Sequence, residues 1–528
     1  MTWREREADV FVAGAGLGAV AAALAAADRG ATVVLAGSSR RIGGQLTSQA
    51  VPPDEHPWIE RFGCTARYRA LRDGIRAYYR AHYPLTAAAG ARPDLNPGAA
   101  RVSALAHEPR VAQAVLEAML AAHRSSGRLE LLLEHDLTAA DVAGQRIRAV
   151  TAGERVVHPA MVIDATEHGD LLPLSGAEHI TGFESREETG EPHAPPVPQP
   201  DNLQPVTACF AVDHLEGEDH TIPRPEGYRP FSLEAPDPRT NRPVARTIHP
   251  NPPGDSAEVG PDHSNPELDR DLWLFRRIAA RENFLPGAYA SDITLVNWPQ
   301  NDYLGGNVIG EDAHRHEAAA RQLSLSLLHW LQTEAGLPGL RLRGDIAGDS
   351  PDGLAEELYI RESRRIRGEL TVVEQDIAHA VRGEHGAVPY PDSVGIGAYR
   401  IDLHPSTGGD PYIDIACCPF RIPLGALVPV RLDNLLAGAK NVATTHITNG
   451  ALPAPSGGVE HRRGGGSRRR PVRGSRHDPA RGPQRPGGAR RPAARARAVG
   501  RRAGVAGRAR LLALKAQPCV PICGGEDP

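Results

Sequence analysis

The sequence is poor in cysteine and in aromatic residues, and it contains no long run of Leu and Phe. Six cysteines among 528 residues are too few for a disulfide-built scaffold, and no signal peptide precedes the first predicted strand. We therefore expect a reducing, cytoplasmic location. The apolar stretch from Val10 to Ala27 consists mainly of Ala, Gly and Val, so we predict no membrane helix. The cysteines are Cys64, Cys209, Cys417, Cys418, Cys519 and Cys523.

Patterns of metal ligands are also missing. The histidines between residues 185 and 265 have no zinc-like spacing, and no four-cysteine spacing suits an iron–sulfur cluster. The sequence therefore predicts no metal site. Hydrophobic residues make up 41% of the chain, which is enough to bury a core in two or three domains.

Positive charge is concentrated near the C-terminal end. The whole chain has a net charge of −4, yet residues 451–528 contain 18 Lys and Arg against four acids. Such a block is typical of nucleic-acid binding, so a nucleic-acid-associated binding protein is one alternative function. The segment from His461 to Arg510 has Asp478 as its only acid and cannot bury a core. We expect a disordered basic tail.

The first forty residues predict a dinucleotide-binding βαβ unit. A short apolar strand (9–13) precedes a glycine-rich turn, an alanine-rich helix to about residue 29 and a second strand (31–36). Glycines let the turn be tight and let the backbone approach a pyrophosphate, and a small residue permits close packing of helix on strand. The start of the helix then offers N–H groups to the phosphates. The predicted cofactor-binding residues of this turn are Gly14, Gly16, Gly18 and Ala19.

The end of the second predicted strand departs from the usual pattern. Gly37 stands where an acid normally binds the adenosine ribose, and Ser38, Ser39, Arg40 and Arg41 follow. Because the 2′-phosphate of NADP binds cations, a missing acid followed by arginines leaves an NADP-binding oxidoreductase open as an alternative.

The stretch from Arg41 to Ser48 favours FAD over NADP. It resembles the Arg-x-Gly-Gly segment that lies against FAD in flavoproteins similar to glutathione reductase and fumarate reductase. A glycine doublet lets the backbone pass close to the cofactor, and hydroxyl groups can bond phosphate or ribose. The FAD-binding residues expected here are Ser38, Arg41, Gly43, Gly44, Thr47 and Ser48.

Further elements follow in an order that suits a flavoprotein. Periodicity predicts a helix over 108–124 and a β meander over 129–151. The buried strand at 158–166 ends in Ala165-Thr166 and resembles the second flavoprotein motif, in which Ala-Thr-Gly lies beside the nucleotide. Glu167 replaces that glycine, and Gly169-Asp170 follows. We assign Ala165, Thr166 and Asp170 to cofactor binding.

The middle of the chain predicts an inserted substrate domain. Residues 185–265 are rich in Pro, Asp, Glu and His and predict irregular loops. Residues 266–395 are more helical, with the clearest helices at 318–334 and 354–368. We therefore place an α+β domain with Pro-rich loops at 181–395, inserted into an α/β, Rossmann-like FAD-binding domain at 1–180 and 396–450.

The segment after the predicted inserted domain also has flavoprotein-like features. Residues 423–429 and 433–450 resemble the strand that closes the FAD domain in related flavoproteins, and Asn449 lies where that segment should meet the flavin. In order, the motifs from Gly14 to Gly450 resemble the FAD-dependent oxidoreductase family that includes bacterial xanthan-lyase-like flavoproteins and is distantly similar to the flavoprotein subunit of heterodisulfide reductase. The resemblance implies FAD, a small-molecule substrate and electron or hydride transfer through the flavin.

The flavin-facing helix expected after Asn449 is absent from the sequence. Codons can be chosen so that residues 452–466 in an alternative frame spell Leu-His-Pro-Ala-Ala-Trp-Asn-Ile-Gly-Glu-Ala-Ala-Gly, which resembles the closing motif of the family. We therefore hypothesise a frameshift near Ala451, so that 451–528 is a misread tail and no nucleic-acid partner is expected. Resequencing of the gene tests this, and an intact frame would rule it out. A frameshift present in the organism would weaken FAD binding.

Two groups of side chains could carry catalysis. Arg361, Arg364 and Arg365 fall on one face of the predicted helix over 354–368, where they could clamp a substrate carboxylate. A solvated face in which Glu357 pairs with Arg361 is the alternative interpretation.

The other group lies nearer the closing strand. At strand spacing, Asp402 and His404 share one side and could form an acid–base pair, although a structural hydrogen bond is equally open. His446 lies in the segment expected to reach the flavin edge.

Overall fold

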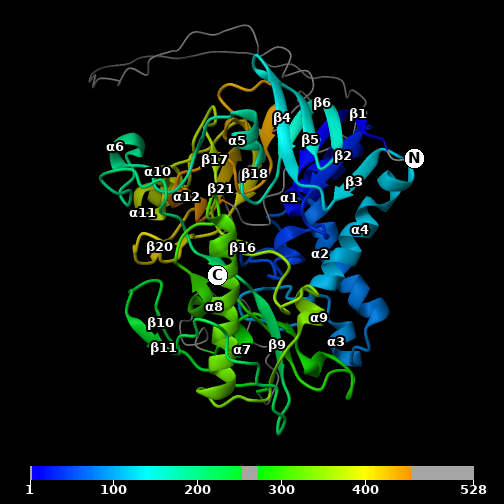
Figure 1. The fold of residues 1–528 in the computed structure, drawn as a ribbon, viewed down its shortest axis with the longest axis vertical. Coiled ribbons are helices and arrows are strands. Elements are labelled where there is room, and N and C mark those ends of the chain that lie inside the picture. The colour runs from blue at the N-terminus through cyan, green and yellow to red at the C-terminus, as the bar shows by residue number, and fades with distance from the viewer. Residues whose placement is uncertain (1–2, 253–270, 453–528) are drawn as a thin grey trace, which may run out of the picture. The chain divides into compact units, whose positions relative to one another are not determined.

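The computed structural model describes residues 3–252 and 271–452 (Figure 1). The described residues belong to one compact unit. The predicted tail therefore lies, from residue 453 onward, outside the described residues. Because the described residues form a single unit, the division into a FAD-binding domain and an inserted domain stays a prediction.

The predicted βαβ unit is present at the N-terminus. Strand β1 (Glu5–Ala13) leads through the glycine turn into helix α1 (Leu17–Ala27), which returns the chain to strand β2 (Val33–Gly37). The two strands are parallel, with Ala13 beside Ala36. The apolar run of the sequence is thus split between a strand and a short helix. Among the described residues, no helix is long and apolar enough to cross a membrane.

The main sheet combines parallel strands with a meander. Its parallel order is β3 (Leu129–Leu133), β2, β1, β6 (Arg155–Asp164) and β22 (Leu435–Ala437). Strand β4 (Leu137–Ala143) pairs in antiparallel fashion with β5 (Arg146–Ala152), and β5 pairs in antiparallel fashion with the start of β6. The meander predicted over 129–151 is wrong in one respect, because β3 joins the parallel sheet and the meander is β4–β5–β6, drawn in cyan in Figure 1.

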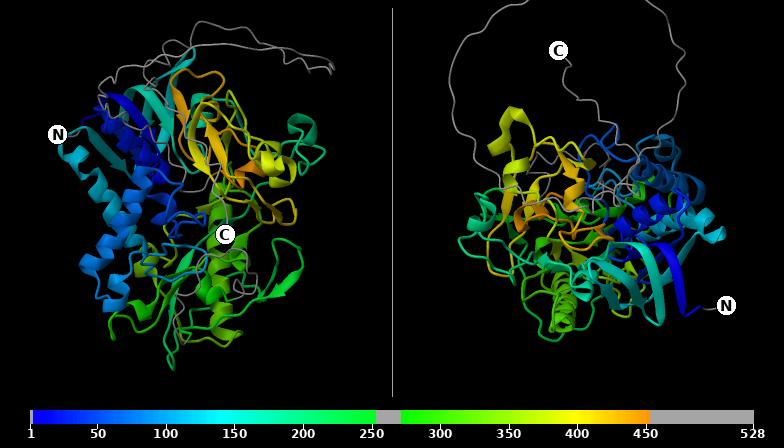
Figure 2. Two further views of the ribbon diagram at one scale, coloured as in Figure 1. Left: turned by 180° about the vertical axis from the view of Figure 1, so that it is seen from behind. Right: turned by 90° about the horizontal axis from the view of Figure 1, so that it is seen from above.

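Two long helices lie side by side along one flank of the molecule (Figure 2). Helix α2 (Ala66–His82) begins where the Thr65 hydroxyl accepts the Tyr68 N–H, and it buries Leu71, Ile75 and Tyr79 at helical spacing. Helix α4 (Pro109–Ser125) confirms the helix predicted over 108–124. Both helices share one apolar core with α1 and with one face of the main sheet.

A second sheet separates this core from another. Its antiparallel order is β12 (Arg277–Ala279), β13 (Ile293–Val296), β9 (Phe210–His214) and β15 (Leu340–Leu342). Along β9 the side chains alternate, so that Ala211 packs toward the core of α2 and α4 while Phe210 and Val212 join a core with α8 (Ala313–Thr333). Helix α8 confirms the helix predicted over 318–334.

The remaining elements are short and connect these layers. The helices are α3 Ala87–Ala91, α5 Leu171–Ser175, α6 Arg186–Thr189, α7 Leu272–Phe275, α9 Gly344–Ala347, α10 Glu374–Ile377, α11 His379–Arg382 and α12 His446–Asn449. The strands are β7 His179–Ile180, β8 Val206–Thr207, β10 Glu234–Pro236, β11 Pro243–Ala245, β14 Asp302–Tyr303, β16 Tyr359–Ile360, β17 Arg365–Ile366, β18 Ser393–Gly397, β19 Ile401–Leu403, β20 Ile413–Ile415 and β21 Phe420–Pro423.

The helix predicted over 354–368 is wrong. Strand β16 pairs with β8, and β17 pairs with β7, so this stretch is extended and joins two separate sheets. Glu362 and Arg365 of this stretch are buried, and Arg361 and Arg365 find partners on other segments rather than lying on one face of a helix. Pairing with distant strands therefore overrides the local pattern.

The glycine turn gives a test of the fold. A Cβ on Gly14 would lie 2.4 Å from the Ala165 carbonyl oxygen at a φ of +101°, whereas one on Gly30, at a φ of +89°, would meet nothing within 4 Å. Gly30→Ala should therefore cost only the backbone strain of about 1–2 kcal/mol, and Gly14→Ala should cost at least twice as much. Urea unfolding measures both, and equal costs would contradict the close approach.

Candidate functional site

The glycine turn forms one half of a cradle suited to a diphosphate. Gly16 precedes α1 in an extended conformation, and no side chain of the described residues caps the first N–H groups of that helix. Its backbone runs beside Gly43, whose N–H donates to the Ala15 carbonyl oxygen at 2.7 Å. Uncapped N–H groups at a helix start attract anions. The glycine turn and the glycine doublet, which lie 27 residues apart in sequence, are therefore in contact. Together they form the cradle.

The hydroxyl groups predicted for the cofactor have partners within the chain. The Thr47 hydroxyl donates to the Ile42 carbonyl oxygen at 2.7 Å, and the Ser48 hydroxyl donates to a Glu357 carboxylate oxygen at 2.5 Å. Ser38 is exposed, and Arg41 donates to the Gly348 carbonyl oxygen at 3.0 Å. The cofactor roles of Ser38, Arg41, Thr47 and Ser48 stay predictions.

A carboxylate lies against the cradle. The side chain of Glu167, which replaces the glycine of Ala-Thr-Gly, is so close that a Cβ on Gly16 would fall 2.8 Å from its Oε1. Lys440 Nζ donates to Glu167 Oε2 at 2.7 Å and to the Ile360 carbonyl oxygen at 2.6 Å. Burial would raise the pKa of Glu167, but the charge and hydrogen bond of Lys440, together with smaller effects of Gln49 and His168, hold this pKa below its usual value.

The end of β6 is fixed by a short hydrogen-bond chain. Asp164 accepts bonds from the Thr166 N–H and hydroxyl, and the Thr166 hydroxyl accepts the Asp170 N–H at 2.8 Å. Burial raises the pKa of Asp164 to about 7, against the lowering effect of the Thr166 donors. Ala165 is fully buried against the Gly14 turn. This chain sets the position of Ala165 beside the cradle.

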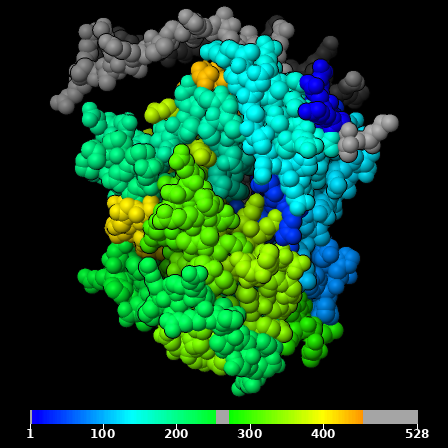
Figure 3. Space-filling model, in the orientation of Figure 1, coloured from blue at the N-terminus to red at the C-terminus, as the bar shows by residue number. Residues whose placement is uncertain are grey.

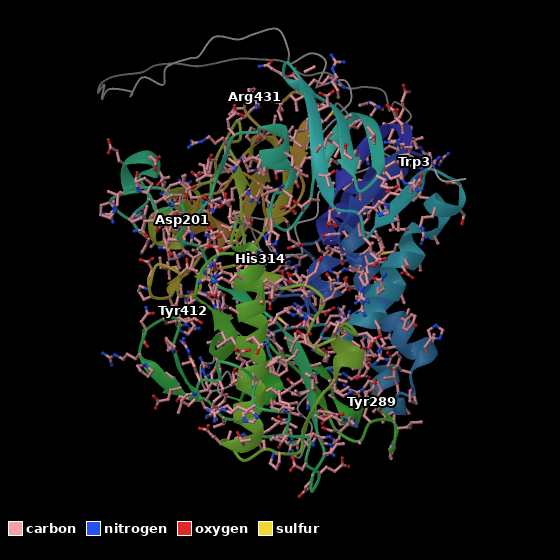
Figure 4. The ribbon with its side chains drawn as sticks, viewed as in Figure 1. Trp3, Asp201, Tyr289, His314, Tyr412 and Arg431 are labelled. Carbon is pink, nitrogen blue, oxygen red and sulfur yellow. The ribbon has the colours of Figure 1, made fainter. Side chains whose placement is uncertain are left out.

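A His–Asp pair lies on a different part of the unit. His404 Nδ1 lies 2.6 Å from Asp302 Oδ2 and 3.3 Å from the Tyr412 hydroxyl. Tyr412 directly precedes β20 and is labelled in Figure 4. The predicted pairing of His404 with Asp402 is wrong: Asp402 lies opposite Asp414 in the β19–β20 ladder, while β14 brings Asp302 to the imidazole.

Arg361 forms an ion pair with Asp302, the carboxylate that contacts His404. Its guanidinium donates to Asp302 Oδ1 at 2.9 Å and to the Thr207 hydroxyl at 2.9 Å, and also reaches Asn297 and the Pro205 carbonyl oxygen. Burial would raise the pKa of Asp302, but Arg361 and His404 outweigh it and hold the pKa below its usual value. The alternative pairing of Arg361 with Glu357 is also wrong, because Glu357 bonds Ser48.

Arg365 belongs to a separate, fully buried network. It ion-pairs with Glu362 and Glu184 and donates to the Gly182 and Thr444 carbonyl oxygens. Glu362 also binds His446 Nδ1 at 2.7 Å, and the His446 ring stacks on Phe183 with centroids 3.5 Å apart. Arg361 and Arg365 therefore point into different networks, and the one-face arrangement that suggested a carboxylate clamp is wrong.

Asn449 is one of several buried polar side chains without a hydrogen-bond partner among the described residues. It lies at the end of α12, which begins where the Thr445 hydroxyl accepts the Thr448 N–H. Both Nδ2 and Oδ1 of Asn449 are buried, and neither has a hydrogen-bond partner among residues 3–252 and 271–452. A buried amide in this state is costly unless a ligand or another segment satisfies it.

Several residues of the site were missed in the sequence. Asp302 lies 102 residues from His404, and Glu184 and Glu362 carry no local motif. Lys440 did leave a signal, because it is the only lysine in residues 1–450 of a chain rich in arginine. Within the described part of the chain, no group of three His, Cys, Asp or Glu side chains could hold a metal ion.

The arrangement of strands and helices identifies the type of fold. A Gly-rich turn between β1 and α1, a parallel sheet, an antiparallel meander and a closing strand β22 form a Rossmann-like dinucleotide-binding fold of the flavoprotein type. A family model for FAD-dependent oxidoreductases matches residues 9–452. The chain belongs to the FAD-dependent oxidoreductase family, whose cofactor is FAD.

Comparison with solved structures gives more distant likenesses. L-proline dehydrogenase from P. horikoshii is 11% identical with a TM-score of 0.25, and the match covers 40% of this chain and 62% of that one. The 3-ketosteroid-Δ4-(5α)-dehydrogenase from Rhodococcus jostii RHA1 is 15% identical (TM-score 0.20, 32% and 48% covered). Thioredoxin reductase from T. acidophilum is 13% identical (TM-score 0.17, 35% and 41% covered). The match spans less than two thirds of each of these proteins, and no curated protein matches the chain.

The described residues fit FAD. Gly16 and Gly44 let the backbones of the turn and the doublet approach each other, with the Glu167 carboxylate as the side chain beside both. Within the described residues, no side chain caps the first N–H groups of α1, and the buried Asn449 amide has no partner. The links to xanthan-lyase-like proteins and to heterodisulfide reductase stay predictions.

Glu191 gives a pH test of the buried region near α12. Burial raises its pKa to about 7 from 4.5, although the Thr445 hydroxyl and the Glu374 N–H donate to it. A folded state with a raised pKa binds an extra proton, so this stabilisation is complete below pH 4.5 and is lost as the pH rises through 7. Glu191→Gln should therefore reduce the pH dependence of the unfolding free energy by about 3 kcal/mol.

Calorimetry or urea unfolding from pH 4.5 to 8 measures this slope. Asp164 and Glu357 also have pKa values near 7, so some slope remains in the variant. Glu187→Gln, on the exposed surface of α6, serves as the control and should leave the profile as in the wild type. An unchanged slope in Glu191→Gln would contradict the prediction.

Arg365 gives a test of the buried charge network. Removing one partner of a buried ion pair leaves the other charge unpaired, so Arg365→Met should lower the unfolding free energy by about 3–5 kcal/mol. The neighbouring Arg364 is partly exposed and lies 3.5 Å from Asp170, so Arg364→Met should cost about 1 kcal/mol or less. Urea unfolding measures both losses. If Arg365→Met loses as little unfolding free energy as Arg364→Met, the Arg365 network is not needed for stability.

Proposed function

We propose that this protein is a flavoenzyme that oxidises or reduces a small molecule, with His404 as the group that moves the proton. The observation that carries the catalytic part is the contact between His404 Nδ1 and the buried Asp302 carboxylate. FAD supplies the electron or hydride transfer when bound. The protein's residues supply binding, orientation and proton transfer.

The cradle residues would hold the cofactor. The first N–H groups of α1 and the glycine doublet suit the diphosphate, and Lys440 adds a positive charge beside them. Asn449 offers a donor and an acceptor from the other end of the unit's sequence. On this proposal Gly14, Gly16, Gly43 and Gly44 lie at the diphosphate. Gly18, whose backbone lies against Gly438, and the buried Ala19 allow the close packing of α1 that the motif needs.

The His404 pair suits acid–base chemistry. Asp302 accepts from Nδ1 and so favours the tautomer that presents Nε2 as the exchanging atom. Arg361 and Thr207 both donate to the second oxygen of Asp302, which fixes the carboxylate in place. A substrate hydroxyl or amine that loses hydride needs a base to take its proton, and Nε2 of His404 can serve as that base.

The alternatives raised by the sequence find no support in the family match. A nucleic-acid-binding role rests on the basic tail, which lies outside the described residues. An NADP site would need Arg40 and Arg41, yet both donate to the Gly348 carbonyl oxygen. The cytoplasmic location stays a prediction.

Absorbance of the purified full-length chain tests the cofactor. We expect a yellow protein, or one that becomes yellow with added FAD and quenches FAD fluorescence. Lys440→Met should weaken FAD binding by about tenfold or more, because a partly buried charge next to the cradle is lost and Glu167 is left unpaired. A colourless wild-type protein that cannot be reconstituted would refute the proposal.

Flavin bleaching under anaerobic conditions tests the acid–base role. A panel of amino acids, hydroxy acids and amines is screened for a donor that bleaches the wild-type flavin. With that donor, His404→Gln and Asp302→Asn should slow bleaching by about 10²- to 10⁴-fold. Their FAD affinity should remain near that of the wild type. Unchanged bleaching rates would exclude His404 from the reaction.

A further inference from the structure

The chain has no room for the acid that normally binds the adenosine ribose. That acid belongs at the end of β2, where Gly37 stands. A Cβ on Gly37 would lie 3.0 Å from the Ala15 nitrogen and 3.0 Å from the Gly14 carbonyl carbon. Since both atoms belong to the backbone of the glycine turn, a side chain at this position requires the cradle itself to shift.

A carboxylate from a distant segment lies at the same edge of the sheet. Glu356 Oε1 accepts the Arg40 N–H at 2.8 Å and the Ser39 hydroxyl at 3.2 Å. Ser39 is two residues beyond Gly37, and backbone bonds from Glu134 to Ser39 and from His135 to Gly37 tie this loop to the end of β3. Glu356 therefore brings an acid to the loop that follows β2.

The second oxygen of Glu356 is available. Oε2 is buried and has no hydrogen-bond partner within residues 3–252 and 271–452, and its ion-pair contact to Arg41 Nε is 3.5 Å. A carboxylate oxygen accepts two hydrogen bonds, and hydroxyl groups are suitable donors. A buried acceptor in this state is satisfied when a ligand hydroxyl reaches it.

The segment that carries Glu356 is held firmly against the cradle loop. The Glu357 N–H donates to the Ser48 carbonyl oxygen at 3.0 Å, and the guanidinium groups of Arg40 and Arg41 both donate to the Gly348 carbonyl oxygen. In the space-filling view, the blue N-terminal residues are recessed beside yellow-green residues of this part of the chain (Figure 3). Such support fixes the carboxylate before a ligand arrives.

We propose that Glu356 supplies the carboxylate that binds the adenosine ribose hydroxyls of FAD, in place of the acid missing at Gly37. This proposal rests on FAD being the bound cofactor. It also accounts for the two arginines, since Arg40 and Arg41 pair with Glu356 and a 2′-phosphate would meet a carboxylate at this position. The residue thereby selects an unphosphorylated ribose.

Binding of two ligands separates this role from a structural one. The full-length apoprotein is titrated with FAD and with FAD whose adenosine lacks the 2′-hydroxyl, and flavin fluorescence reports both affinities. The wild type should prefer FAD by about 10- to 100-fold, since a hydrogen bond to a charged group is at stake. Glu356→Ala should bring this ratio close to one, and the isosteric Glu356→Gln should give an intermediate ratio.

Glu357→Gln is the matched control. It lies in the same segment and removes a bond to the cradle loop, so it should change both affinities by the same factor and keep the wild-type ratio. Equal ratios in the wild type and in Glu356→Ala and Glu356→Gln would overturn the proposal while leaving FAD binding intact. A wild-type protein that binds neither ligand would instead refute the proposed function.

Discussion

The buried charges around Arg365 hold the candidate site together. Charged groups taken out of water are costly unless every one has partners, so such a network forms only when all its segments are in place. Here Arg365 joins Glu362 and Glu184, and Glu362 joins His446. These residues come from three stretches of the chain: one before α6, one from Glu362 to the start of β17, and one at the start of α12. The network therefore fixes the end of the family's closing segment against the middle of the chain.

The segment from Tyr359 to Arg365 connects this buried network to the cofactor cradle and to the His–Asp pair. Its backbone accepts Lys440 at Ile360, which sets the lysine against Glu167 and the glycines. One residue further, Arg361 points to Asp302 and so to His404, while Glu362 points to His446. Because neighbouring residues of an extended chain face opposite ways, seven residues can bind three separate parts of the site. A helix over the same residues could not do this, which is the physical reason why the predicted helix fails.

The parts of the fold that were predictable depend on short-range signals. The β1–α1–β2 unit follows from a glycine turn between two apolar runs, and α4 and α8 follow from helical periodicity, because each element buries one stripe of its own residues. In the proposed acid–base pair, His404 is the histidine named from the sequence, but its carboxylate partner is Asp302 and not Asp402. Nothing near His404 marks Asp302, since only the pairing of β14 with β8 brings it close. Long-range pairing of short strands leaves almost no pattern in a sequence.

Departures of the cradle from the flavoprotein pattern are matched by residues from elsewhere in the chain. Glu167, in place of glycine, adds a negative charge beside a diphosphate site, and Lys440 neutralises it from 273 positions away. Gly37 removes an acid, and Glu356 brings one to the following loop from the segment before β16. At each position the local sequence departs from the family pattern, and a charged residue from a distant segment restores the charge that the pattern would give there. The chemistry of the cradle is therefore a property of the folded unit, and a motif search alone would have scored both positions as losses.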